Sequence, residues 1–168
     1  MLDVVIVGAG PAGCAAAITA RRAGLSVAVL DRAGFPRDKI CGDGLTTSAL
    51  RELEALGLDP SGLPSWFVVD AAVVRSPSGE EVTLPMPVDG GIHAAVARRA
   101  ELDIALVDLA RAAGATVLER HTVTGVHTGA DHVTITTEKD GTFIARHVVA
   151  ADGMWSPVRR LLGLDQPG

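Results

Sequence analysis

The residues of this chain with the clearest chemical use are three glycines near its N-terminus, spaced as Gly8, Gly10 and Gly13. A run of β-branched residues precedes them and an alanine-rich segment follows, which is the order of a strand, a tight turn and a helix. In that setting Gly8 permits the turn, Gly10 lets the backbone approach a pyrophosphate, and Gly13 packs the helix on the strand. The free N–H groups and positive dipole end of the helix would then bind the phosphates.

A carboxylate suited to the other end of such a ligand stands at Asp31, roughly 20 residues beyond the turn and at the end of the next apolar run. It could accept hydrogen bonds from adenosine ribose hydroxyls, and it disfavours a 2′-phosphate, so NADP is not expected here. Arg32, the next residue, is included in the candidate site. The alternative is a structural glycine turn followed by a solvated acid. The combined pattern favours a dinucleotide site without separating NAD from FAD.

A second candidate site lies near the other end of the chain, at Asp152 and Gly153. They follow a predicted buried strand over 147–151, so the carboxylate would reach the cleft at the strand C-termini. The alternative is an Asp-Gly turn that caps a short helix starting near Ser156, because Asp-Gly is a common turn pair. The residues alone favour neither reading.

The loop 35-FPRDKICGDGLTTSAL-50 combines Cys41 with Gly42 and Gly44, which could bring backbone N–H groups close to a ligand. Its basic residues Arg37 and Lys39 are expected to be solvated, although they could compensate a phosphate or flavin charge. The other cysteine, Cys14, is expected in the core. Two cysteines make no disulfide framework, and the scattered histidines suggest neither a metal site nor a catalytic base. No catalytic residue is assigned.

The elements that must position these residues begin with a βαβ unit: a strand over 3–7, a helix over 11–23 and a buried strand over 25–30. Helices are expected over 47–56 and 99–113, and strands over 66–75, 81–84 and 115–118. An antiparallel meander laid over the sheet is expected across 122–145, with turns at 128–131 and 139–141. The predicted fold is α/β, Rossmann-like, with a parallel sheet and this antiparallel β-meander.

The bulk composition limits the function classes. With 168 residues, 48% of them hydrophobic, the chain has the size and core of one domain. A net charge of −5 without long basic runs leaves no footprint for nucleic acid. The apolar N-terminus lacks a basic region, so it is not a signal peptide, and no apolar run is long enough to span a membrane. These features suggest a cytoplasmic protein.

Three segments together resemble the geranylgeranyl reductase family of FAD-dependent oxidoreductases, which includes menaquinone reductases. They are the glycine turn with FPRDKICGDGL, the helix start RAELD at 99–103, and ADGMWSPVRRLLG at 151–163. The resemblance covers nearly the whole chain and implies the p-hydroxybenzoate hydroxylase-like fold. Two positions depart from the family pattern: Ala151 replaces a glycine, and Leu102 replaces a phenylalanine.

The resemblance also implies which residues contact FAD. On the adenosine side they are Ala12 in the glycine turn, Asp31, and Val123 on a later strand. On the flavin side they are Cys41, Gly42 and Gly44. Arg99 at the helix start also matches the family's contacts, and Asp152-Gly153 matches the motif shared with flavin hydroxylases. Cys41 would lie beside the isoalloxazine ring.

The function implied is an FAD-dependent oxidoreductase that reduces the C=C bonds of prenyl groups on a lipid or quinone, with NAD(P)H or another reductant as electron donor. The alternatives are an FAD-dependent aromatic hydroxylase and a non-catalytic FAD- or ADP-binding fragment. The family's downstream Gly-Asp motif and substrate-binding sheet are not found in this sequence. We therefore expect an N-terminal FAD-binding domain of a longer enzyme, inactive alone. A prenyl substrate would make peripheral membrane contact possible.

Overall fold

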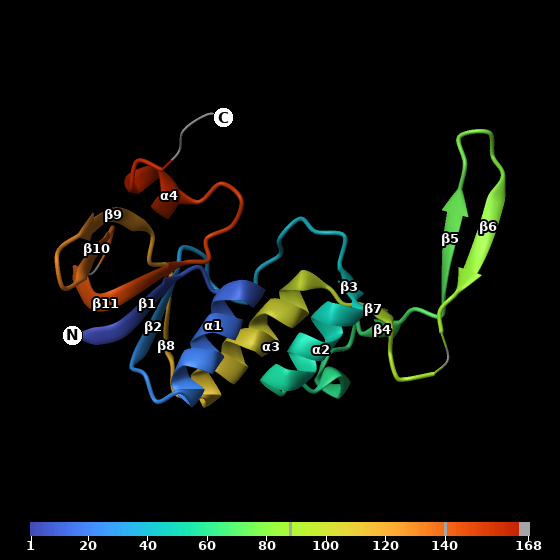
Figure 1. The fold of residues 1–168 in the computed structure, drawn as a ribbon, viewed down its shortest axis with the longest axis horizontal. Helices are drawn as coiled ribbons and strands as arrows, with labels where there is room; N and C mark the ends of the chain where they lie inside the picture. The colour runs from blue at the N-terminus through green and yellow to red at the C-terminus, as the bar shows by residue number, and fades with distance from the viewer. Residues whose placement is uncertain (88, 140, 165–168) are drawn as a thin grey trace. The chain divides into compact units, whose positions relative to one another are not determined.

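The computed structural model describes residues 1–87, 89–139 and 141–164, and the chain forms two compact units. The first unit comprises Met1–Arg37 and Asp103–Gly168, and the second comprises Asp38–Leu102. Asp140, in one of the expected turns, lies outside the described residues. Figure 1 shows the elements of both units.

The first unit is built on a six-stranded sheet with the order β8-β2-β1-β11-β10-β9. Its strands are β1 (Leu2–Val7), β2 (Val27–Asp31), β8 (Thr116–Glu119), β9 (Val123–Thr128), β10 (Val133–Thr137) and β11 (Thr142–Ala150). The pairs β8–β2, β2–β1 and β1–β11 are parallel, and the pairs β11–β10 and β10–β9 are antiparallel. The predicted α/β fold with a parallel sheet and an antiparallel meander is confirmed.

The meander differs from the expectation in one respect: it continues the main sheet and does not lie over it. β11 makes this possible because its first residues pair antiparallel with β10, while Ala145–Ala150 pair parallel with β1. The separate strands expected before and after residue 145 are therefore one strand of nine residues. Through β11 the meander therefore connects directly to β1, at the centre of the sheet.

Helices cover one face of this sheet (Figure 1). The side chains on the other face form a separate apolar core. The helices are α1 (Pro11–Arg22) and α3 (Arg99–Ala112), whose first turn belongs to the second unit. Apolar side chains of α1 and α3, such as Ile18 and Leu106, are fully buried. On the opposite face Val5, Val7 and Leu30 pack with the meander and with Val158 of the short helix α4 (Pro157–Leu161). Alternation along β1 thus supplies both cores.

The second unit contains a small antiparallel sheet and an isolated hairpin. The sheet has the order β3-β7-β4, with β3 (Gly44–Thr46), β7 (Ala94–Val96) and β4 (Phe67–Val68). The hairpin consists of β5 (Ala71–Arg75) and β6 (Glu81–Pro85), and the helices are α2 (Thr47–Leu56) and the 3-10 turn η1 (Pro60–Gly62). The single strand expected over 66–75 is wrong, because Val69 and Asp70 break it into β4 and β5. The strands β3 and β7 were not predicted.

Candidate functional site

The glycine turn connects β1 to α1 in a conformation that needs glycine. Gly8 has φ of 99°, in the left-handed region, and a Cβ at this position would overlap the carbonyl of Ala151. A Cβ on Gly13 would overlap the carbonyl oxygen of Gly8. The two glycines therefore allow α1 to start directly against the ends of β1 and β11.

The N-terminus of α1 carries no side-chain cap. Gly10 is the N-cap residue, Pro11 follows it, and the first turn contains no acidic residue. Ala12 is exposed, so the first turn is open to a ligand. The free N–H groups and the helix dipole at such a terminus favour an anion, as a pyrophosphate would require.

Asp31 is buried, with 7% of its surface exposed, and its carboxylate is bonded to the turn itself. Its Oδ2 accepts a hydrogen bond from the Ala9 N–H at 2.7 Å, and its Oδ1 accepts one from the Ala33 N–H at 2.8 Å. An ionised carboxylate has about four acceptor positions, so two bonds leave capacity for ribose hydroxyls. Asp31 is thus no solvated charge, whereas Arg32 beside it is exposed.

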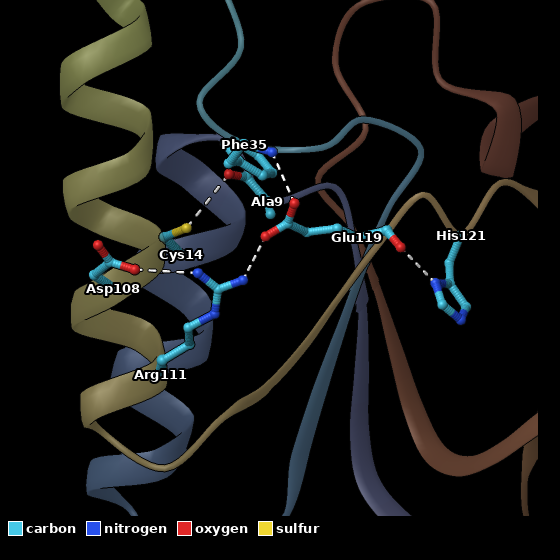
Figure 2. A network of polar contacts seen from close by, with 7 residues as sticks. All are labelled: Ala9, Cys14, Phe35, Asp108, Arg111, Glu119 and His121. Atoms are coloured by element: carbon cyan, nitrogen blue, oxygen red, sulfur yellow. Dashed lines mark hydrogen bonds and ion pairs between the residues drawn. The ribbon is translucent and has the colours of Figure 1, made fainter.

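The loop after β2 is fixed by Glu119, at the end of β8. The Glu119 Oε2 accepts a hydrogen bond from the Phe35 N–H at 2.8 Å, and its Oε1 pairs with Arg111 of α3, which also contacts Asp108 (Figure 2). The Phe35 N–H and, to a lesser extent, the Arg111 guanidinium lower the pKa of the Glu119 carboxyl. Sequence reasoning missed this contact, because its partners lie 84 positions apart and no local pattern marks them.

Replacing Glu119 by glutamine should therefore destabilise the chain in a pH-dependent way. Because the folded state lowers the pKa of Glu119 below its ordinary 4.5, the stabilisation is complete above that value and is lost as the pH falls through the folded pKa. We expect the melting-temperature difference between wild type and Glu119→Gln to be largest near neutral pH and to vanish in acid. Thermal unfolding followed by circular dichroism from pH 3 to 8 measures it, and a pH-independent difference would contradict the assignment.

Arg37 was expected to be solvated, and that expectation is wrong. Its side chain is 17% exposed, and its Nη1 lies 3.3 Å from Oδ2 of the fully buried Asp103. Its Nη2 lies 3.8 Å from the Asp31 carboxylate, and its Cζ is 5.0 Å from the centre of the Phe35 ring. Lys39 is exposed, as expected. Burial of Arg37 follows from the two carboxylates, since both need a cation in an interior position.

Asp152 supports the start of α4, whose N-cap is Ser156 with its Oγ accepting from the Arg159 N–H at 3.1 Å. The Asp152 Oδ2 accepts a hydrogen bond from the Val158 N–H at 2.9 Å, in the first turn of α4, and Gly153 has φ of 91°. The neighbouring Ala151 donates its N–H to the Val7 carbonyl at 2.8 Å and closes the sheet next to Gly8. The bond from the Val158 N–H to Asp152 supports the capping role without excluding a ligand role. Contact of Asp152 and Gly153 with FAD therefore stays a prediction.

Val123 opens β9 and is 9% exposed. Its side chain belongs to the apolar core on the α4 face of the sheet. A contact with an adenine at this position would therefore use the backbone of Val123 and not its side chain.

The second unit holds the remaining predicted cofactor residues. Cys41 is exposed, and the pKa of its thiol is lowered by a hydrogen bond from the Asp43 N–H and, secondly, by the Arg99 side chain. A Cβ on Gly42 would meet no atom within 4 Å, and one on Gly44 would make only an ordinary contact. Neither has a positive φ, whereas Asp43 between them does, at 54°. No contact within the described residues requires glycine here, so contact of Gly42 and Gly44 with a cofactor stays a prediction.

The lowered pKa of Cys41 leads to a labelling prediction. We expect iodoacetamide to alkylate Cys41 at neutral pH but not Cys14, which is buried and whose pKa burial raises to about 12. Arg99→Gln should slow the labelling of Cys41, because it removes a group that stabilises the thiolate. Peptide mass spectrometry measures both rates, with the unfolded protein as the control in which both cysteines react.

The same experiment tests the place of Cys41 in the cofactor site. If the loop lies against a flavin, adding FAD should protect Cys41 from iodoacetamide. Equally fast labelling with and without bound FAD would show that Cys41 is a surface thiol away from the cofactor.

The structure thus divides the predicted cofactor residues between its units. The first unit holds the residues of the turn, the end of β2 and three later residues: Gly8, Gly10, Ala12, Gly13, Asp31, Arg32, Val123, Asp152 and Gly153. The second unit holds Cys41, Gly42, Gly44 and Arg99. A groove of about 710 Å³ in the second unit, lined by Leu50, Trp66 and Ile92 among others, contains none of these predicted cofactor residues.

Three features of the first unit fit the adenosine diphosphate half of FAD. They are the open turn, the free acceptor capacity of Asp31, and the buried Nε of Arg37, which has no hydrogen-bond partner.

Within residues 1–87, 89–139 and 141–164, no three His, Cys, Asp or Glu side chains gather closely enough to hold a metal ion. None of the helices described there has both the length and the apolar character needed to cross a membrane.

Comparison with known proteins identifies relatives of two kinds. The chain is 42% identical to the menaquinone reductase of Mycobacterium tuberculosis and 34% identical to the digeranylgeranylglycerophospholipid reductase of Methanocella arvoryzae, matching 96% and 97% of this chain. It is 33% identical to the 12-dehydrotetracycline 5-monooxygenase/anhydrotetracycline 6-monooxygenase of Streptomyces rimosus, over 99% of this chain and 33% of that protein. The chain spans only 40% and 42% of the lengths of the two reductases.

A solved structure agrees with these relatives. The geranylgeranyl bacteriochlorophyll reductase-like protein of Thermoplasma acidophilum superposes with a TM-score of 0.81 and 29% identity, over 98% of this chain and 42% of that one. The sequence model of the FAD binding domain matches residues 1–168, the entire chain. The chain therefore belongs to the FAD binding domain family of flavoproteins.

Proposed function

We propose that an enzyme carrying this chain is an FAD-dependent oxidoreductase that reduces C=C bonds of a prenyl group on a lipid or quinone. The observation that supports FAD as the cofactor is the glycine turn at the start of α1, which has no side-chain cap and whose Ala9 N–H donates to the Asp31 carboxylate. The reductases among the relatives support a prenyl group on a lipid or quinone as the substrate. Bound flavin would supply the hydride, and NAD(P)H or another reductant would supply its electrons.

The residues of this chain would bind and orient the cofactor. The N–H groups at the start of α1 would hold the pyrophosphate, and Asp31 would accept hydrogen bonds from the ribose hydroxyls. The backbone at Gly42 and Gly44 would approach the flavin, with Cys41 beside the ring. Asp152 and Gly153 would close the site at the end of β11.

For the 168 residues alone we propose binding without turnover. The residues for the adenosine diphosphate half all belong to the first unit, so ADP should bind to this chain almost as tightly as FAD. Isothermal titration with ADP and FAD tests this. An affinity for FAD that exceeds that for ADP by orders of magnitude would instead assign much of the binding to the flavin half.

The enzyme activity can be tested in a chimera in which this chain replaces the matching part of the M. tuberculosis menaquinone reductase. The flavin is reduced without oxygen, a prenylated quinone is added, and the flavin spectrum is followed. Reoxidation with formation of a product two hydrogens heavier supports prenyl reduction. A flavin that stays reduced under these conditions contradicts it, provided that the parent enzyme is reoxidised.

The second candidate is an aromatic hydroxylase, favoured by the similarity to the S. rimosus monooxygenase. Its signature would be reoxidation that needs both dioxygen and an aromatic substrate, with one oxygen atom added to the product. A lipid-like substrate would bring the enzyme to a membrane surface from the cytoplasm, which flotation with lipid vesicles would detect.

A further inference from the structure

The side chain of Arg37 is held rigidly inside the first unit. Its Nη1 pairs with Asp103 at 3.3 Å, its Nη2 lies 3.8 Å from Asp31, and its Cζ stands over the Phe35 ring. Asp103 is fully buried in α3. These contacts immobilise a side chain that on a surface would be free, and they fix the direction of its remaining N–H group.

That remaining group, the Nε–H, has no partner. In the part of the protein that the structure describes, it is the only buried side-chain nitrogen or oxygen atom for which this holds. A buried donor left without an acceptor is costly, so such groups are rare and need an explanation. Two carboxylates fix the guanidinium of Arg37 and neither takes this donor, which is the arrangement expected when the acceptor comes from a ligand.

The position of Arg37 indicates which acceptor atoms the ligand would present to its Nε–H. Asp31 Oδ2, the atom next to its Nη2, also accepts the N–H of Ala9 in the glycine turn. The free donor therefore lies close to the end of β2, where the adenosine diphosphate half of the cofactor is expected. The acceptors available there are the ribose hydroxyl oxygens and the pyrophosphate oxygens.

We propose that Arg37 is a cofactor-binding residue whose Nε–H donates a hydrogen bond to an oxygen of the adenosine diphosphate half of FAD. Asp103 is its positioning residue, because it holds the guanidinium in place from α3. The proposal rests on FAD binding by this chain. It adds to the glycine turn and Asp31 a third group, contributed by the loop after β2.

Substitution by lysine separates the hydrogen bond from the charge. Lysine keeps the cation beside Asp31 and Asp103 but has a methylene group, which cannot donate a hydrogen bond, at the position of the arginine Nε. Because hydrogen bonds to charged groups are among the strong ones, we expect Arg37→Lys to weaken ADP binding about 10-fold or more. Asp103→Asn should weaken it in the same direction by releasing Arg37. The control is Arg146→Gln, which removes only an exposed pair with Asp3 and should leave the affinity within about two-fold.

The experiment measures the dissociation constants of ADP and adenosine by isothermal titration, with folding checked by circular dichroism. A loss in Arg37→Lys for both ligands places the acceptor on the ribose, and a loss for ADP alone places it on the phosphates. Folded Arg37→Lys with wild-type affinity for ADP overturns the proposal. Wild-type protein that binds neither ADP nor FAD would instead refute cofactor binding itself.

A second readout needs no substitution at Arg37 in the protein that is measured. In a ¹⁵N spectrum of the arginine side chains, the Nε–H signal of Arg37 should shift on addition of ADP and exchange more slowly with water. In Asp103→Asn the same signal should already be displaced before ADP is added. An Arg37 signal that does not change while the backbone signals of the glycine turn shift would overturn the proposal, even if Arg37→Lys fails to fold.

Discussion

Replacing Gly13 by alanine is expected to abolish ADP binding and to lower the free energy of unfolding by about 3 kcal/mol or more. The added Cβ would overlap the carbonyl oxygen of Gly8, which is backbone and cannot rotate away. Relief requires α1 to move off the end of β1, and this movement dismantles the turn whose N–H groups should bind the pyrophosphate. The loss of binding should therefore exceed what the loss of stability alone explains.

Gly62→Ala is the matched control for this substitution. Gly62 has no positive φ, and a Cβ added there would meet nothing within 4 Å. Urea unfolding and ADP titration of both variants give the comparison. Near-normal ADP affinity in Gly13→Ala would show that the close approach of α1 to the turn is not needed for binding.

Replacing Asp31 by alanine is expected to weaken ADP and FAD binding by about 10- to 100-fold, because each charge-assisted hydrogen bond contributes roughly 1.5–3 kcal/mol. Two effects act together. The ribose hydroxyls lose their acceptor, and the Ala9 and Ala33 N–H groups lose the carboxylate that orders them. The second effect connects Asp31 to the shape of the turn and could not be foreseen from its position after a strand.

Asp152→Ala provides the comparison, and its effect on binding should be smaller. Its bond to the Val158 N–H supports the first turn of α4, whose N-cap is Ser156, so the main loss should be that of one capping hydrogen bond, about 1 kcal/mol of stability. Titration of ADP and FAD into both variants decides the order. Equal losses of affinity would show that the ribose contact has been misplaced.

The sequence by itself determined the opening βαβ unit of the fold and the nature of the turn. β1, α1 and β2 follow from a buried β-branched run, an alanine-rich segment and a second apolar run, all of them local patterns. The roles of Gly8 and Gly13 were predicted for the same reason, since a tight turn between strand and helix has strict local requirements. The resemblance added FAD, and the match to the FAD binding domain agrees with it.

Only the tertiary structure decided the features that depend on residues far apart in the sequence. β11 joins the meander to the parallel sheet by pairing with β10 and β1 along different parts of its length, a choice that depends on hydrogen bonds between distant strands. Arg37 looked solvated because its neighbours in sequence are polar, yet Asp103 on α3 and Asp31 on β2 bury it. Glu119 reaches Phe35 across a separation of 84 positions. Local periodicity records which face of an element is apolar, but a buried ion pair is stabilised only when distant elements bring both charges together, so no local pattern predicts it.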